Sequence, residues 1–142
     1  MSKSPTNHQG FSVIESAMAM IILTVGLFAV VQFFPLSLKI VGNSQQTTTA
    51  TNLALEQIEA ISQLNYDNIT PGTLEAKQRL ASDPGSYLYS YQRQTVVETV
   101  DADFNPSPTD IGFKKIVVTV YWLSPIGAVE KSIALNLVRT NY

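Results

Sequence analysis

The chain contains no cysteine and only one histidine, His8, among its 142 residues. Without cysteine it can build no disulfide, thiolate nucleophile, redox pair or cysteine-ligated zinc site. A serine–histidine–aspartate mechanism also lacks a base anywhere beyond the polar start of the chain. These absences predict a protein that is not an enzyme and that carries no catalytic residue, metal or cofactor.

Charged residues are also scarce. They make up 14% of the chain, and the formal net charge is −2 at pH 7. A nucleic-acid-binding surface needs lysine and arginine gathered in a patch, whereas the 9 basic residues here are spread over the chain. The charge pattern therefore predicts no nucleic-acid partner.

A long apolar segment lies near the N-terminus. Between Glu15 and Lys39 there is a run of 23 residues without any charge. As a helix this run is about 35 Å long, enough to cross the hydrocarbon core of a membrane. A cleaved secretory signal is the alternative, but its small-residue cleavage motif should follow the apolar run, and Ala17-Met18-Ala19 lies at its front. We therefore expect a membrane-spanning helix.

Glu15 stands at the entrance to this apolar segment. A carboxylate inside hydrocarbon costs roughly 3 kcal/mol, so we expect it to have a partner or to lie at the headgroup boundary. No lysine or arginine lies three or four positions away along a helix. Cleavage after Gly10 would create an α-amino group on Phe11, four positions before Glu15. That cation would neutralise the carboxylate of the same chain or of a neighbouring one.

The segment around Glu15 resembles the N-terminal motif of the type IV prepilin family. The matching residues are Gly10, Phe11, Ser12, Val13, Ile14 and Glu15, followed by the apolar run. The resemblance implies cleavage between Gly10 and Phe11 by a membrane-embedded prepilin peptidase, followed by N-methylation of Phe11. It also implies that Glu15 acts in subunit recruitment and register. The leader departs from the family because Lys3 is its only basic residue.

Two residues in the apolar segment disfavour a helix. Gly26 weakens a helix interior by about 1 kcal/mol, and Pro35 removes a backbone hydrogen bond at a cost of about 3 kcal/mol. The sequence therefore predicts a kink or local melting between them. The resemblance implies that such melting can accompany assembly into a filament, and a static kink without a function is the alternative.

Beyond residue 49 the apolar residues recur at helical spacing. The repeating positions are Ala50, Leu53, Ala54, Ile58, Ile61 and Leu64. This pattern predicts that the same helix continues over residues 11–64 and covers a C-terminal domain with its apolar face. The stretch 53–59, ahead of Tyr66 and Asp67, is also similar to minor pilins of the V type and to I-type pseudopilins of type II secretion.

The C-terminal part predicts an antiparallel sheet. Three stretches, 87–100, 113–123 and 129–140, are rich in β-branched and aromatic residues, and the linker 124–128 is expected to form a hairpin. Between two proline–glycine turns, the stretch 73–80 is expected to form a short helix. The expected apolar faces are Leu88, Val96 and Val100, then Ile116, Val118, Val120 and Trp122, then Ile133, Leu135 and Leu137.

Two further patterns are weaker. Tyr87, Tyr89 and Tyr91 are expected on one face of the first strand, either as half-buried packing or as a sticky surface. The segment 101–110 begins like a calcium loop, but Pro106 replaces the glycine that such a loop requires. An acidic connector without a metal is therefore the favoured interpretation.

These patterns predict an α+β fold in which a long N-terminal helix, with an apolar membrane-spanning half, packs on a small antiparallel β-sheet. The expected parts are a leader at 1–10, a transmembrane and assembly half of the helix at 11–38, an amphipathic half at 39–65 and a globular β domain at 66–142.

With the resemblance, they indicate a structural subunit of a type IV pilus or a type II secretion filament, in particular a minor pilin or pseudopilin. The implied partners are the prepilin peptidase, other pilin or pseudopilin subunits, an inner-membrane assembly platform and, before assembly, membrane lipid. The implied location is the bacterial inner membrane with a cytoplasmic N-terminus, then a surface pilus or periplasmic pseudopilus. The alternative is a single-pass membrane-anchored extracytoplasmic binding domain that keeps its first ten residues and does not assemble.

Overall fold

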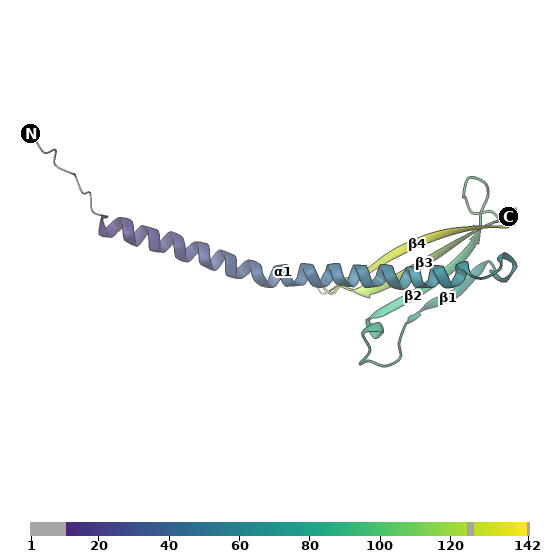
Figure 1. The fold of residues 1–142 in the computed structure, drawn as a ribbon, viewed down its shortest axis with the longest axis horizontal. Coiled ribbons are helices and arrows are strands. Elements are labelled where there is room, and N and C mark those ends of the chain that lie inside the picture. The colour runs from purple at the N-terminus through teal and green to yellow at the C-terminus, as the bar shows by residue number, and fades with distance from the viewer. Residues whose placement is uncertain (1–10, 125–126, 142) are drawn as a thin grey trace, which may run out of the picture. The chain divides into compact units, whose positions relative to one another are not determined.

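A computed structural model describes residues 11–124 and 127–141 of the chain (Figure 1). The helices and strands are α1 (Val13–Ser62), η1 (Tyr66–Asn68), β1 (Gly72–Arg79), η2 (Tyr87–Ser90), β2 (Tyr91–Thr99), β3 (Phe113–Leu123) and β4 (Glu130–Thr140). The expected leader at 1–10, with Gly10, lies outside the described residues, as do Pro125 and Ile126 of the expected hairpin. The chain divides into two compact units, Met1–Leu38 and Lys39–Tyr142.

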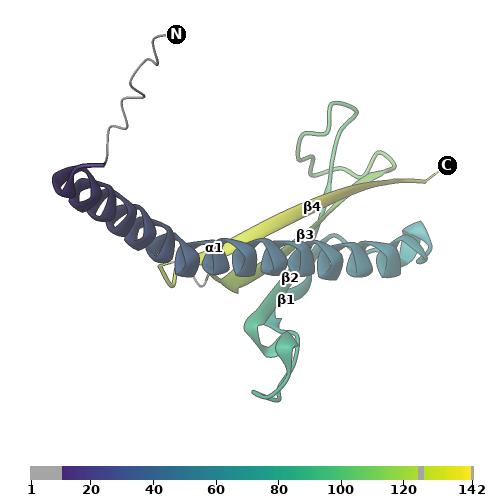
Figure 2. The same ribbon diagram turned by 60° about the vertical axis from the view of Figure 1, so that its left-hand side comes forward.

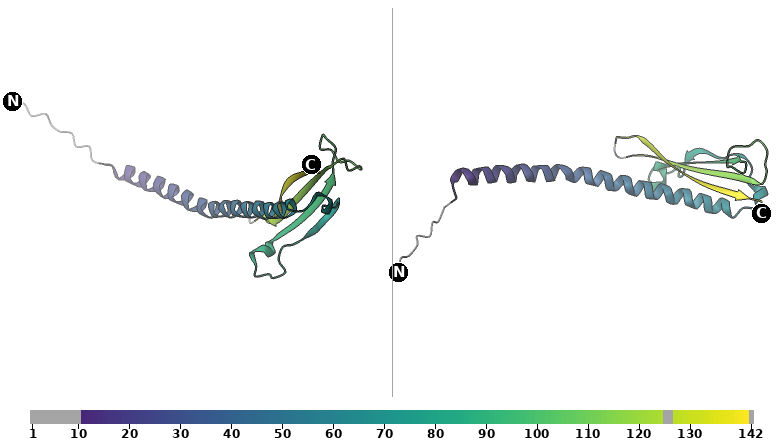
Figure 3. Two further views of the ribbon diagram at one scale, coloured as in Figure 1. Left: turned by 45° about the vertical axis from the view of Figure 1, so that its right-hand side comes forward. Right: turned by 90° about the horizontal axis from the view of Figure 1, so that it is seen from above.

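In the second unit, α1 and the four strands form two layers, as predicted for an α+β fold. The strands are antiparallel in the order β1-β2-β3-β4, so each pairs with its neighbour in sequence. The last turns of α1 lie across one face of this twisted sheet (Figure 2 and Figure 3). A meander of this kind needs only short connections between strands, which suits a small domain.

The helix face toward the sheet follows the predicted 3.6-residue period. Ala50, Leu53, Ala54 and Ile61 are buried there, and Ile58 packs against them. The prediction is wrong for Leu64, which is 40% exposed. The reason is that α1 ends at Ser62 and the chain turns away, so the fully buried Ile69 is the next apolar residue to enter the core.

Two strands have the predicted inward faces. On β3, the four alternate residues Ile116, Val118, Val120 and Trp122 are all buried. On β4, Ile133, Leu135 and Leu137 are partly buried against the same core. The apolar residues that recur at every second position made both inward faces readable from the sequence.

The predicted apolar face of the first strand is confirmed for Val100, which is fully buried, and for Leu88, which packs against the core, but it is wrong for Val96 in β2. Tyr91, Thr95 and Val97 face the core, so Val96 lies on the opposite face of the sheet from the one expected. The tyrosine stripe is also wrong, because Tyr87 and Tyr89 belong to the 3-10 helix η2 and only Tyr91 is in the strand. The Ser86 side chain accepts a hydrogen bond from the Leu88 N–H over 3.3 Å, which starts η2 and delays the strand.

The expected helix at 73–80 is a strand instead. Its residues include good helix formers, but β1 pairs with β2 at five positions, with register shifts on either side of Glu75. Pairing of this edge strand with β2 therefore outweighs local helix propensity, which amounts to only a few tenths of a kcal/mol per residue.

Candidate functional site

The candidate site is the start of α1, where Phe11 and Glu15 lie. Phe11 precedes the helix, and its side chain is 78% exposed. Glu15 lies in the first helical turn and is exposed. The Glu15 carboxylate therefore belongs to the first turn of α1, four residues after Phe11.

A cap that the sequence analysis missed begins the helix. The Ser12 Oγ accepts a hydrogen bond from the Glu15 N–H over 3.2 Å, and the Ser12 carbonyl accepts one from the Ser16 N–H over 3.2 Å. Serine at the cap with glutamate three residues later is a capping-box pattern, and it was visible as Ser12-x-x-Glu15. The partial positive charge of the helix N-terminus also favours the Glu15 carboxylate. The Glu15 carboxylate is thus stabilised by the N-terminus of its own helix.

The side chains that follow are uncovered. Within the apolar window of α1 none is buried by the rest of the chain, and the large apolar side chains from Val13 to Leu38 are 47–88% exposed. The core helix of a soluble domain would be covered instead. By length and composition this part of α1 can cross a membrane. It needs either lipid or other protein chains around it.

Two hydroxyl side chains in the apolar segment are hydrogen-bonded to the preceding turn of the helix. The Thr24 hydroxyl donates to the Met20 carbonyl over 2.7 Å, and the Ser37 hydroxyl donates to the Phe33 carbonyl over 3.0 Å. Such bonds to the preceding turn remove the cost of placing a hydroxyl in hydrocarbon. The segment is therefore compatible with lipid at these two positions.

Gly26 and Pro35 lie inside a continuous helix. α1 runs through both residues without interruption. A Cβ atom added at Gly26 would meet nothing within 4 Å, so no neighbour in the described chain requires glycine there. The kink or melting between them stays a prediction.

The acidic connector caps its own turn. The Asp101 Oδ1 accepts hydrogen bonds from the N–H groups of Asp103 and Asn105, each over 2.9 Å. Among the described residues there is no group of three or more histidine, cysteine, aspartate or glutamate side chains that could hold a metal ion. The Asp101 carboxylate therefore serves to shape the connection between β2 and β3.

A polar cluster that the sequence did not predict joins the connection between β2 and β3 to the segment after α1. The Tyr66 hydroxyl donates to Asp110 Oδ1, and the buried Lys114 places its Nζ 3.1 Å from the Tyr66 carbonyl and 3.9 Å from the centre of its ring. Burial, followed by the hydrogen bond to Asp110 and the charges of Asp110 and Asp67, raises the pKa of Tyr66 to about 12. The cluster therefore ties the segment after α1 to the connection between β2 and β3.

No protein-family model, curated protein or solved structure matched the chain. The function of the chain therefore has to be inferred from its own residues.

Proposed function

We propose that the chain is a prepilin or pseudopilin, a non-enzymatic structural subunit of a type IV pilus or a type II secretion filament. The observation that supports this most directly is the uncovered apolar half of α1, which starts two residues after Phe11 and has Glu15 in its first turn. Such a subunit requires a short polar leader, a cleavage site and an apolar helix.

The exposed apolar side chains suit storage in a membrane followed by assembly. As a monomer the helix is solvated by lipid tails. When copies bundle outside the membrane, the same side chains bury one another, so no large apolar surface meets water in either state. Gly26 adds to this argument, since a Cβ atom there would meet no other part of the described chain within 4 Å, so a helix of another subunit can approach it closely.

The charges at the helix start support an ordered assembly. Cleavage after Gly10 creates a cation at Phe11, and Glu15 supplies the anion. In a dry bundle each charge would be costly alone, so pairing between neighbouring subunits favours one register over others. N-methylation of Phe11 leaves this cation in place.

The unit with the β-sheet faces solvent in this proposal and carries the specificity of the subunit. The resemblance of residues 53–67 favours a minor subunit. Its partners are the prepilin peptidase, other pilin or pseudopilin subunits and an inner-membrane assembly platform. Before assembly the protein lies in the bacterial inner membrane, with a cytoplasmic N-terminus.

The competing function is a single-pass membrane-anchored binding domain that never assembles. Mass spectrometry of the protein extracted from membranes separates the two. The filament proposal expects an N-terminus at N-methylated Phe11 when the peptidase is present, and an intact Met1 when it is deleted. An intact leader in both strains would favour the anchor and refute the proposal.

A further inference from the structure

The two edges of the sheet differ in how they are protected against further strand pairing. The strand order β1-β2-β3-β4 leaves one side of β1 and one side of β4 without a neighbouring strand. β1 has the usual protection of an edge strand, with two register shifts and the charged residues Glu75, Lys77 and Arg79. β4 instead pairs with β3 at eleven consecutive positions without a shift, contains no proline, and has an uncharged centre at 132–138. The outer edge of β4 is therefore open to another strand.

Two hydrogen bonds at the ends of β4 show which of its backbone groups point outward. The Ser124 N–H donates to the Val129 carbonyl over 2.9 Å, and the Asn141 N–H donates to the Gly112 carbonyl over 3.1 Å. Both bonds lie in the register of the β3–β4 pair, where opposite residues exchange hydrogen bonds at every second position. The odd-numbered residues of β4 therefore bond to β3, and the N–H and C=O groups of the even-numbered residues point away from β3.

The outward backbone groups form a continuous row. In the part of the chain that the structure describes, none of them has a hydrogen-bond partner, and they include those of Ser132, Ala134, Asn136, Val138 and Thr140. Ladder hydrogen bonds from a further strand would satisfy the whole row at once. The group that fits this edge is thus an extended polypeptide backbone.

Apolar side chains on the core face of β4 are incompletely covered. Ile133, Leu135 and Leu137 are only partly buried, whereas the residues opposite them on β3 are fully buried because strands lie on both sides of β3. A segment with apolar residues at every second position would cover the open side of this row. The edge therefore favours a segment that alternates in the same way as the strands of the sheet.

The charges that flank the uncharged centre of β4 are basic. Among the described residues, Lys131 and Arg139 have only neutral partners: the Lys131 Nζ lies 3.1 Å from Asn43 Oδ1, and the Arg139 Nη2 donates to the Leu64 carbonyl over 3.1 Å. Glu130, the only acidic residue of β4, already contacts the Lys77 Nζ over 2.8 Å. Acidic groups at the ends of an added segment would therefore be favoured.

The same charges disfavour a second copy of β4 as the partner. Any antiparallel pairing of two β4 strands brings two copies of Lys131 and of Arg139 to one interface. Pairing centred on Leu135 would place Lys131 directly opposite Arg139, and like charges opposite one another are destabilising. A segment of a different protein is therefore the better partner.

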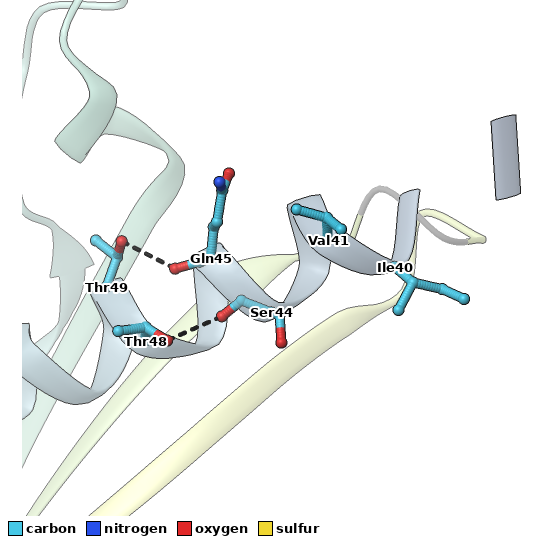
Figure 4. A pocket seen from close by; sticks show the side chains of 6 residues that line it. All are labelled: Ile40, Val41, Ser44, Gln45, Thr48 and Thr49. Carbon is cyan, nitrogen blue, oxygen red and sulfur yellow. Dashed lines mark hydrogen bonds between the residues drawn. The ribbon is translucent and has the colours of Figure 1, made fainter. Parts of the chain in front are cut away.

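The side chains of α1 offer a weaker docking surface. A hollow on the helix is lined by Ile40, Val41, Ser44, Gln45, Thr48 and Thr49 (Figure 4). The hydroxyls of Thr48 and Thr49 donate to the carbonyls of Ser44 and Gln45 over 3.1 and 3.0 Å, so these donors are already used within the helix. The outward backbone groups of β4 have no such partner.

We propose that the outer edge of β4 binds an extended segment of another protein, with alternating apolar residues and acidic ends, as a fifth strand of the sheet. Backbone hydrogen bonds to residues such as Ala134 and Asn136 hold the segment, and its acidic ends meet Lys131 and Arg139. The proposal does not depend on filament assembly, because all these residues belong to the unit Lys39–Tyr142.

Synthetic peptides test the proposal on the full chain in detergent. The probe has about nine residues, with valine and threonine alternating between a glutamate at each end. One control peptide has lysine at both ends, and a second has N-methylated backbone nitrogens throughout its centre. Amide hydrogen exchange resolved by NMR is the readout. With the probe, the amides of Ser132, Ala134 and Asn136 should exchange about tenfold or more slowly, whereas those of Ile133 and Leu135 are protected by β3 beforehand.

Two substitutions at one position separate the backbone from the side chain. Asn136→Pro removes an outward N–H and no hydrogen bond to β3, whereas Asn136→Ala changes the side chain and keeps the N–H. Asn136→Pro should weaken probe binding about tenfold or more, and Asn136→Ala should bind like the unchanged protein. Circular dichroism and the protection of the Leu135 amide verify that both variants fold.

Four outcomes would overturn the proposal. The first is protection of the even-numbered β4 amides before any peptide is added, together with a dimer in light scattering, because a second copy then occupies the edge. The second is that no peptide slows their exchange. The third is equal binding of the N-methylated peptide, which means that the backbone is not recognised. The fourth is equal binding of the lysine-ended peptide, which means that the partner is not selected by its acidic ends.

Discussion

Arg93 holds the Glu75 carboxylate from the neighbouring strand, with Nε 2.8 Å from Oε2 and Nη2 3.3 Å from Oε1. The Thr95 hydroxyl adds a third donor over 3.2 Å. Burial by itself raises the pKa of Glu75, but the hydrogen bonds from Arg93, Gln78 and Thr95 and the Arg93 charge outweigh it and hold the pKa below its usual value. The pair ties the edge strand β1 to β2 beside the core.

Removing one partner of this pair should destabilise the fold. The two side chains are only 16% and 13% exposed, so Arg93→Met leaves a carboxylate poorly solvated and should cost about 3 kcal/mol. Lys77→Met is the matched control, because the Lys77–Glu130 pair is 36% and 51% exposed and should cost under about 1 kcal/mol. Urea unfolding followed by Trp122 fluorescence measures both, and equal losses would contradict the assignment.

Tyr66 should make the protein sensitive to alkali. Its pKa is raised from 10.0 to about 12 in the folded state, so its contribution to stability is complete below pH 10 and is lost as the pH rises toward about 12. Tyr66→Phe should cost under about 1 kcal/mol at neutral pH and should flatten the fall in unfolding free energy across that window. Denaturation series at several alkaline pH values test this, and an unchanged slope in the variant would refute it.

Glu15→Ala should separate membrane insertion from assembly. Insertion should be unchanged or improved, because the change removes a charge at the entrance to the apolar segment. Incorporation into filaments should fall about tenfold or more, since the Phe11 cation loses its partner in the bundle. Quantitative immunoblots of membrane and sheared-filament fractions measure both. Glu56→Ala, an exposed carboxylate elsewhere on α1, is the control, and normal incorporation of Glu15→Ala would disprove the pairing role.

Gly26→Ala tests the predicted melting of α1 between Gly26 and Pro35. The change should stabilise the helix by about 1 kcal/mol and clash with nothing in the chain, since a Cβ there meets no atom within 4 Å. If melting or close approach of subunits is required, incorporation should fall while insertion stays normal. Gly42→Ala is equally open and lies outside the uncharged run, so it serves as the matched control. Equal assembly of both variants would leave Gly26 without a role.

The sequence alone predicted the elements whose pattern does not depend on a partner. An uncharged apolar run of 23 residues is long enough to indicate a helix that can cross a membrane. The spacing of Ala50, Leu53, Ala54 and Ile61 marks one helix face regardless of what it covers. Apolar residues at every second position likewise marked the inward faces of β3 and β4. The position of Glu15 at the helix start was predicted, and its cap at Ser12 was readable from the same residues.

Only the tertiary structure decided the rest, because those features depend on distances between segments far apart in the chain. β1 is a strand because β2 lies beside it, and Glu75 meets Arg93 only across that pairing. Asn43 and Lys131 are 88 positions apart by residue number and meet only once α1 covers the sheet. Local propensity describes one segment at a time, whereas strand pairing, ion pairs and pockets are properties of segments brought together.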